Sequence, residues 1–150
     1  MTILELKSSF THAYRQPATA IYSLPANINA PAEDIDTDTH LDITSHLAHG
    51  IYLLLSKNND GNIKYWSLNE PELIKVNISE LTVPLQDTWI RHSVNVFGHY
   101  IKQGIEIQSG YDILIWGNLP ATAGITAANA LQQITATALN DQLSNSISIF

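Results

Sequence analysis

The fold is decided by residues 111–131, which read YDILIWGNLPATAGITAANAL. The apolar and aromatic run at 111–116 predicts a strand, Gly117 predicts a turn, and an alanine-rich helix pattern begins near Gly124. A strand, a loop of small residues and a helix can together bind phosphate, because backbone N–H groups and the helix dipole point at the anion. The loop holds only two glycines, however, and Thr122 stands where a third would be expected. The stretch is therefore either a working nucleotide site or the remains of one.

The composition limits the class of protein and its partners. A chain of 150 residues with 45% hydrophobic and 14% charged residues predicts one globular domain over residues 1–150. The 7 Lys and Arg against 14 Asp and Glu give a net charge of −7, which argues against nucleic acid or an anionic membrane as a partner. The absence of cysteine excludes disulfides, thiolate metal sites and thiol catalysis. No signal peptide and no membrane-spanning run is visible, so we expect a cytoplasmic location.

Hydrophobic periodicity predicts the elements that precede the opening stretch. We expect a short helix, four strands and an amphipathic helix, in chain order at residues 3–14, 18–24, 51–55, 63–68, 73–78 and 87–103. Asn58 to Asn62 form a turn of the Asp-Gly type, which predicts a hairpin of the second and third strands. Gly104 is placed to end the amphipathic helix, and the alanine-rich helix is expected to end near residue 140. This order of elements indicates an α+β fold.

Several motifs follow the order and spacing of one enzyme family. Residues 25–37, PANINAPAEDIDT, align with the pattern P-G-R-V-N-L-I-G-E-H-T-D-Y and match it at Pro25, Asn29, Glu33 and Asp36. Residues 58–69, NNDGNIKYWSLN, resemble D-D-G-x-V-x-x-x-S-L-N, and the helix pattern near Trp89 resembles W-x-x-Y-V-x-G. Over nearly its whole length the chain thus resembles the N-terminal lobe of galactokinase, one of the GHMP sugar and small-molecule kinases. The resemblance implies a mixed sheet with helices packed on it, of the ribosomal protein S5 domain 2 type.

The resemblance also implies a nucleotide site. The family's phosphate loop, G-x-x-P-x-G-x-G-L-S-S-S-A-A, aligns with residues 117–130 and gives the nucleotide-binding candidates Gly117, Pro120, Thr122, Gly124 and Thr126. Family members bind ATP and Mg²⁺. Here Thr122 replaces the middle glycine and would crowd the phosphate, while Ala127 and Ala128 replace two serines whose hydroxyls would meet phosphate or Mg²⁺. We therefore expect ATP and Mg²⁺ to bind weakly or not at all, and expect no cofactor.

The first motif implies a sugar site. In the family the Glu, His and Asp of this motif bind sugar hydroxyls, which makes Glu33, Asp34 and Asp36 the substrate-binding candidates here. Carboxylates accept hydrogen bonds from hydroxyls, so a reduced sugar site is conceivable although Asp34 replaces the histidine. Asn27 replaces an arginine that lies beside the reacting hydroxyl in the family, and it supplies no charge. Glu33 and Asp36 could also serve only as turn or cap residues.

The same region contains two groups of residues that resemble metal ligands. The acidic run at residues 33–42 could bind Ca²⁺, yet it lacks the invariant glycine and terminal glutamate of an EF-hand, and a solvated turn explains it as well. Three histidines, at positions 40, 46 and 49, could bind Zn²⁺ with a nearby carboxylate. Because scattered histidines are usually surface or core residues, we predict no metal site.

Three functions follow from these observations. The sequence shows no counterpart of the family's catalytic Asp and metal-binding Glu, so we expect the C-terminal lobe to be absent and do not expect a kinase acting alone. The candidates are a catalytically silent sugar-binding or regulatory module, half of a split sugar kinase with a separately encoded partner lobe, and a decayed fragment without a ligand. Residues 121–150 carry a single charged side chain, Asp141. We expect a homodimer to cover the apolar surface there, unless the tail at 146–149 does so as an added strand.

Overall fold

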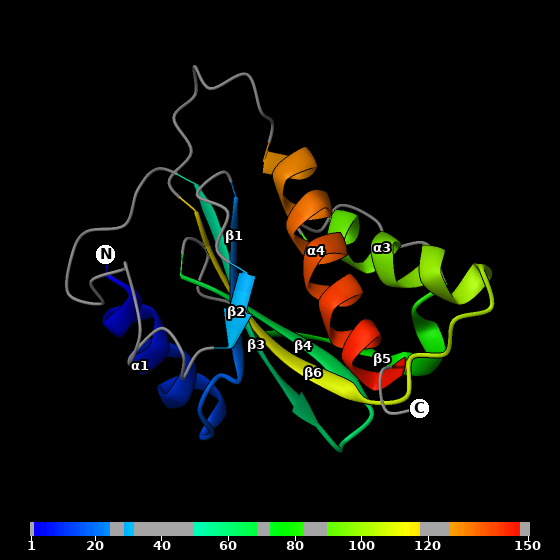
Figure 1. Ribbon diagram of the computed structural model, residues 1–150. Coiled ribbons are helices and arrows are strands. Elements are labelled where there is room, and N and C mark those ends of the chain that lie inside the picture. Colours follow the sequence, from blue (N-terminus) through cyan, green and yellow to red (C-terminus); the bar gives the residue numbers. More distant parts are fainter. Residues whose placement is uncertain are drawn as a thin grey trace.

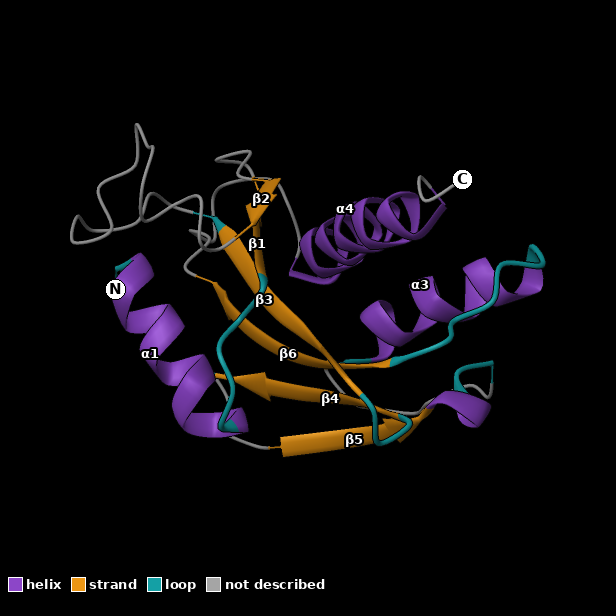
Figure 2. Cartoon of the chain, turned by 60° about the horizontal axis from the view of Figure 1, so that its bottom comes forward, coloured by secondary structure: helices purple, strands orange, loops and turns teal. Residues whose placement is uncertain are grey.

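Within the described residues, six strands form one mixed sheet with helices on both faces (Figures 1 and 2). The computed structural model describes residues 2–24, 29–31, 50–68, 73–82, 90–117 and 127–147. The strand order across the sheet is β2-β1-β3-β6-β4-β5, which confirms the predicted α+β class. The elements in chain order are α1 (Ile3–Tyr14), β1 (Ala20–Leu24), β2 (Asn29–Pro31), β3 (Ile51–Asn58), β4 (Asn62–Ser67), β5 (Leu73–Asn77), the 3₁₀ helix η1 (Ile78–Glu80), α3 (Arg91–Lys102), β6 (Gly110–Gly117) and α4 (Ala127–Ile147).

Helix α1 forms where the sequence predicts it and covers one face of the sheet (Figure 2). Thr2 caps its N-terminus, because the Thr2 hydroxyl accepts a hydrogen bond from the backbone N–H of Glu5 at 3.1 Å. The helix ends at Arg15, which adopts the left-handed conformation with φ 60°. The side chains that α1 buries against the sheet recur at three- and four-residue steps, at Ile3, Leu6 and Phe10.

Strands β3 and β6 form the centre of the molecule, because both of their faces are buried. Successive residues of a strand point to opposite faces of the sheet. On β3, Leu53 packs in the core beneath α3 and α4, and the next residue, Leu54, packs in the core beneath α1. On β6, Ile113 and Leu114 are divided between the same two cores. Burial on both faces explains why each strand reads as a continuous apolar run.

The predicted hairpin of residues 51–55 and 63–68 is wrong, since β6 lies between β3 and β4. Strand β6 pairs antiparallel with β3 and parallel with β4, and the Asp-Gly turn that joins β3 to β4 passes across the start of β6. Gly110 makes this crossing possible. A Cβ at this position would lie 2.1 Å from the side-chain oxygen of Asn58 and 2.4 Å from the carbonyl oxygen of Asn62. The turn was predicted correctly, but a strand from much later in the chain takes the place between its arms.

Helices α3 and α4 pack against each other and cover the face of the sheet opposite α1 (Figure 2). Helix α3 buries Val94 and Phe97, as its amphipathic pattern predicts. It ends before Gly104, whose φ of 88° is a conformation that glycine adopts without strain. The predicted C-terminal stop is therefore confirmed.

Helix α4 is longer than predicted, since it continues past residue 140 to Ile147. Leu143 explains the extension, because it follows Leu139 by one helical turn and packs against the same core. The alternative of a tail strand at 146–149 is wrong for residues 146 and 147, which are helical. The rest of that tail lies outside the described residues.

Candidate functional site

The strand–loop–helix stretch has the predicted form on both sides of its loop. Strand β6 ends at Gly117, and α4 begins at Ala127 without an acidic residue in its first turn that would neutralise the helix dipole. A Cβ on Gly117 would lie 3.6 Å from the carbonyl oxygen of Gly50, an ordinary contact, so the described packing does not require glycine there. The other nucleotide-binding candidates lie outside the described residues: Pro120, Thr122, Gly124 and Thr126.

The start of the sugar motif and the phosphate loop leave the sheet at the same end. Cross-strand pairing places Leu24 of β1 opposite Ile51 of β3, and Ile51 opposite Gly117 of β6. The chain thus leaves β1 two strand spacings, or roughly 10 Å, from where it leaves β6 toward the phosphate loop. Figure 1 shows α4 beginning at this end of the sheet. Strand β2 then runs back along β1, so that Pro31 lies opposite Ala20 at the other end of β1 before the chain reaches the acidic candidates. The sugar-binding candidates themselves lie outside the described residues: Glu33, Asp34 and Asp36.

Neither of these segments carries a cationic side chain. All 7 Lys and Arg residues of the chain lie outside residues 25–37 and 117–131. Lys57 belongs to the opposite end of β3, and Lys64 of β4 forms an ion pair with Asp60. The hydrogen bond from Lys64 lowers the pKa of Asp60, so this lysine already has an acidic partner. A phosphate at the candidate site would meet backbone N–H groups and the helix dipole, but no cation from these segments.

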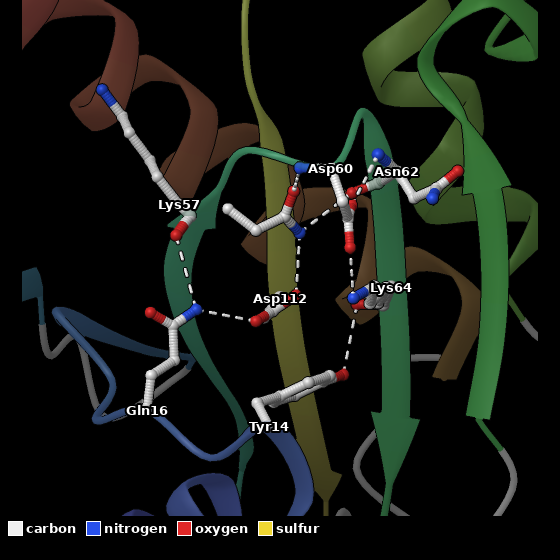
Figure 3. Close-up of polar contacts among 8 residues, drawn as sticks. Tyr14, Gln16, Lys57, Asp60, Asn62, Lys64 and Asp112 are labelled. Atoms are coloured by element: carbon white, nitrogen blue, oxygen red, sulfur yellow. Dashed lines mark hydrogen bonds and ion pairs between the residues drawn. The ribbon is translucent and has the colours of Figure 1, made fainter.

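A polar cluster that the sequence did not predict holds the opposite end of the sheet (Figure 3). Asp112 is 3% exposed, and its carboxylate accepts hydrogen bonds from Gln16 Nε2 at 2.7 Å and from Asn58 Nδ2 at 2.8 Å. Asn58 also donates to the carbonyl oxygen of Asn62 at 3.1 Å, within the β3–β4 turn. Because Asn58 bonds to both Asn62 and Asp112, it ties this turn to β6. The available signal was a single acidic residue in the apolar run 111–116, because a buried carboxylate needs hydrogen-bond donors. The cluster serves the fold.

A chain of buried hydroxyl groups fixes α4 and α3 to the sheet. Thr135 donates to the carbonyl oxygen of Leu131 at 2.7 Å. Each hydroxyl has one proton, so Ser93 donates to Thr135 at 2.8 Å and Tyr65 donates to Ser93 at 2.7 Å. These bonds join β4, α3 and α4, and they hold the helix that follows the candidate phosphate loop in the sequence.

A second polar contact holds the later part of α4 against β1. The hydroxyl of Tyr22 donates to the carboxylate of Asp141 at 2.6 Å and accepts from Gln142 Nε2 at 2.9 Å. Burial and the hydrogen bond to Asp141 raise the pKa of Tyr22, which keeps the hydroxyl protonated at neutral pH. The single charged residue beyond position 121 therefore has a structural role.

The described part of the chain contains no group of three or more His, Asp or Glu side chains arranged to hold a metal ion. The three candidate histidines and the acidic run at 33–42 lie outside it. None of the described helices is long and apolar enough to cross a membrane.

Comparison with known proteins relates the chain to galactokinases. No model of a known protein family matches it. It is 27% identical to the galactokinase of Clostridium beijerinckii and 28% identical to that of Enterococcus faecalis, in both cases over 138 residues, 91% of this chain and 36% of the relative. A galactokinase of Clostridium perfringens is 27% identical over 150 residues, which are 99% of this chain and 39% of the relative. The chain thus spans less than half the length of the curated relatives that it matches.

Solved structures show the same relationship in the fold. The galactokinase of Lactococcus lactis complexed with galactose matches 94% of this chain and 37% of its own, with a TM-score of 0.68 and 17% identity. The mevalonate kinase of Methanococcus jannaschii matches 64% of this chain and 31% of its own, with a TM-score of 0.57 and 13% identity. The chain is thus similar in sequence to galactokinases over most of its length, and it has an α+β fold like that of the N-terminal lobe of GHMP kinases.

Proposed function

We propose that this chain is a catalytically silent galactokinase-like module that binds a sugar and serves in regulation rather than in phosphate transfer. The observation that carries the proposal is a contrast between the sugar motif, which keeps its carboxylates, and the phosphate loop. Strand β1 leads into the start of the sugar motif roughly 10 Å from where β6 leads into the phosphate loop, and β2 then carries the chain back along β1 before Glu33. Neither segment, however, supplies a cation or the full set of glycine and serine residues of the family's loop.

Catalytic silence follows from what phosphate transfer requires. The reaction depends on close positioning and on stabilisation of charge by a metal, a cation and hydrogen-bond donors. Thr122 takes the place of a glycine that would let the backbone approach phosphate. Ala127 and Ala128, which open α4, take the place of serines that would donate to phosphate or hold Mg²⁺. The chain therefore has no strong site for ATP and Mg²⁺, and it does not act alone as a kinase.

Sugar binding is supported by the acidic residues that the first motif retains. Glu33 and Asp36 keep the family's carboxylates, and Asp34 still offers an acceptor in place of the histidine. Two or three carboxylates can accept hydrogen bonds from neighbouring sugar hydroxyls. Galactose is the first sugar to test, because the Lactococcus lactis relative was solved in complex with it.

A thermal-shift series with galactose, glucose and ATP–Mg²⁺ tests the proposal, since a ligand that binds only the folded chain raises its Tm. We expect galactose to raise the Tm of the wild type by clearly more than that of the double variant Glu33→Gln with Asp36→Asn. The matched control is Asp38→Asn with Asp42→Asn, which removes two carboxylates from the same acidic segment and should respond as the wild type does. An equal galactose shift in the first variant and the wild type, or no shift in the wild type, would contradict a sugar site at this motif.

Half of a split sugar kinase is the second candidate function. It is supported by the share of the relatives that the chain covers, 36% to 39%. A separately encoded partner would then supply the remaining lobe, the metal ligand and the catalytic base. Phosphorus NMR of the chain with galactose and ATP–Mg²⁺, alone and mixed with the remaining part of the Clostridium beijerinckii enzyme, separates the two functions. We expect no sugar phosphate in either case, whereas its formation only in the mixture would support the split kinase.

A further inference from the structure

A groove of about 730 Å³ runs along the surface between α3 and α4. Its volume falls within the range of about 300–1,000 Å³ that is typical of small-molecule sites. The groove shares no residue with the candidate sugar or nucleotide segments. Its walls are amide and imidazole side chains: Asn95, His99 and Gln103 on the α3 side and Gln132, Gln133 and Asn140 on the α4 side.

The chemistry of the groove favours a neutral ligand. Among the residues that the structure describes, no Asp, Glu, Lys or Arg lines it, although the chain as a whole carries a net charge of −7. A charged ligand would lose hydration there without gaining an ion pair. Each amide group offers two N–H donors and a carbonyl acceptor in one plane. Such groups match neighbouring hydroxyls, which both donate and accept.

The groove is ready to bind without rearrangement of its hydrogen bonds. The side chains of Asn95, Gln132 and Gln133 are exposed and make no hydrogen bond within the described part of the chain. Tyr100 donates to the side-chain oxygen of Asn140, which joins the two walls and leaves the N–H groups of Asn140 available. A ligand would therefore displace only water from these amides.

The floor of the groove suits the ring of a sugar. It includes Val96, which is buried, and Ala136 and Tyr100, which are partly buried. A sugar ring has apolar C–H faces and a rim of hydroxyls, so a ring on this floor places its hydroxyls at the amide walls. We propose that the α3–α4 groove is a second binding site, for a neutral saccharide, separate from the sugar motif at residues 25–37.

Titration of the isotope-labelled chain with galactose, glucose and lactose, followed by NMR of its amide groups, tests this site. We expect saturable shifts of the side-chain amides of Asn95, Gln132 and Gln133, with a Kd on the order of 1 mM. The double variant Asn95→Ala with Gln132→Ala should weaken binding roughly tenfold, because it removes two hydrogen-bonding groups. The control Gln108→Ala removes an exposed amide outside the groove and should leave the Kd unchanged.

Failure of the groove site can be distinguished from failure of the sugar motif at residues 25–37. The variant Glu33→Gln with Asp36→Asn should keep the groove shifts, so that loss of one site leaves the other measurable. The substituted groove residues are exposed, and an unchanged backbone spectrum verifies the fold of that variant. Absence of saturable groove shifts with all three sugars up to their solubility limits overturns the proposal. Groove shifts that depend on protein concentration instead of sugar would make the groove an interface between copies, and would overturn it as well.

Discussion

Gly110 and Asp112, two residues at the start of β6, decide how the β3–β4 turn passes across that strand. The absence of a side chain at Gly110 leaves room for Asn58 and the carbonyl of Asn62. The carboxylate of Asp112 then accepts the amide N–H of Asn58 and of Gln16. The space at Gly110 and the acceptor at Asp112 therefore fix the β3–β4 turn together. The pairing of β6 with both β3 and β4 depends on this turn.

Gly110→Ala should lower the free energy of unfolding by about 3 kcal/mol, because the new Cβ would overlap a backbone carbonyl that cannot easily move. Gly117→Ala, at the other end of the same strand, is the matched control. Its Cβ would make only ordinary contacts, and its effect should stay within about 0.5 kcal/mol. Urea unfolding of both variants measures the difference, and equal midpoints would contradict the crossing described here.

Asp112→Asn should cost about 1–3 kcal/mol, because an amide N–H₂ would replace an acceptor that faces two amide donors. Asp60→Asn removes a carboxylate from an exposed ion pair in the neighbouring turn and should cost clearly less. The two unfolding free energies are compared in the same urea series. A larger loss for Asp60→Asn would show that the exposed pair, and not the buried cluster, secures the turn.

Most elements could be predicted from their own residues, but their arrangement in the sheet could not. Periodicity located α1, β3, β6 and the end of α3, since each buries a face that its sequence displays. The insertion of β6 between β3 and β4 depends on pairing between strands that are far apart in the sequence. The residues of the Asp-Gly turn do not indicate this pairing. The full length of α4 does not follow from the sequence, because polar residues at 140–142 interrupt the apolar pattern before Leu143.

The candidate site was predictable only in part. The strand and helix that flank the phosphate loop follow from the residue pattern. Glu33 and Asp36 stay candidates that rest on a family motif, because two carboxylates in a polar stretch of sequence carry no signal of their own. Ser93 and Thr135, which hold α4 in place, were missed since a hydroxyl in a helix reveals its partner only after the helices pack.

The hydroxyl chain between β4, α3 and α4 gives a prediction at the level of the helices. Thr135→Val keeps the shape of the side chain but removes the hydroxyl that bonds to Ser93 and Leu131, and it should cost about 1–3 kcal/mol. Thr137→Val removes a similar bond to a preceding carbonyl on the exposed side of α4 and should be nearly neutral. Thermal unfolding followed by circular dichroism measures both. Equal losses would mean that burial of the hydroxyl chain contributes nothing.

The homodimer expected to cover residues 121–150 stays a prediction, and the sheet offers a different place for an association of two copies. Among the described strands β5 is an outer strand, and outer strands can pair with a second copy. Leu73 at its start is 45% exposed, while Lys75 weakens such pairing. We therefore expect a weak twofold dimer through β5.

Light scattering over a concentration series measures this association. The apparent mass of the wild type should rise with concentration, and Leu73→Asp should keep the chain monomeric, because a carboxylate would have to be buried in the interface. Leu4→Asp changes a comparably exposed apolar side chain, on α1, and should leave the association unchanged. A wild type that stays monomeric at the highest concentration would exclude the dimer.

The account as a whole rests on the claim that a galactokinase-like lobe is present without a working phosphate loop. Calorimetric titration with ATP–Mg²⁺ tests it most directly, in the wild type and in the triple variant Thr122→Gly, Ala127→Ser and Ala128→Ser, which restores the family's residues. We predict no saturable heat for the wild type and measurable binding for the triple variant, because glycine admits phosphate and the serines donate to it. Micromolar, saturable binding of ATP–Mg²⁺ by the wild type would contradict the claim.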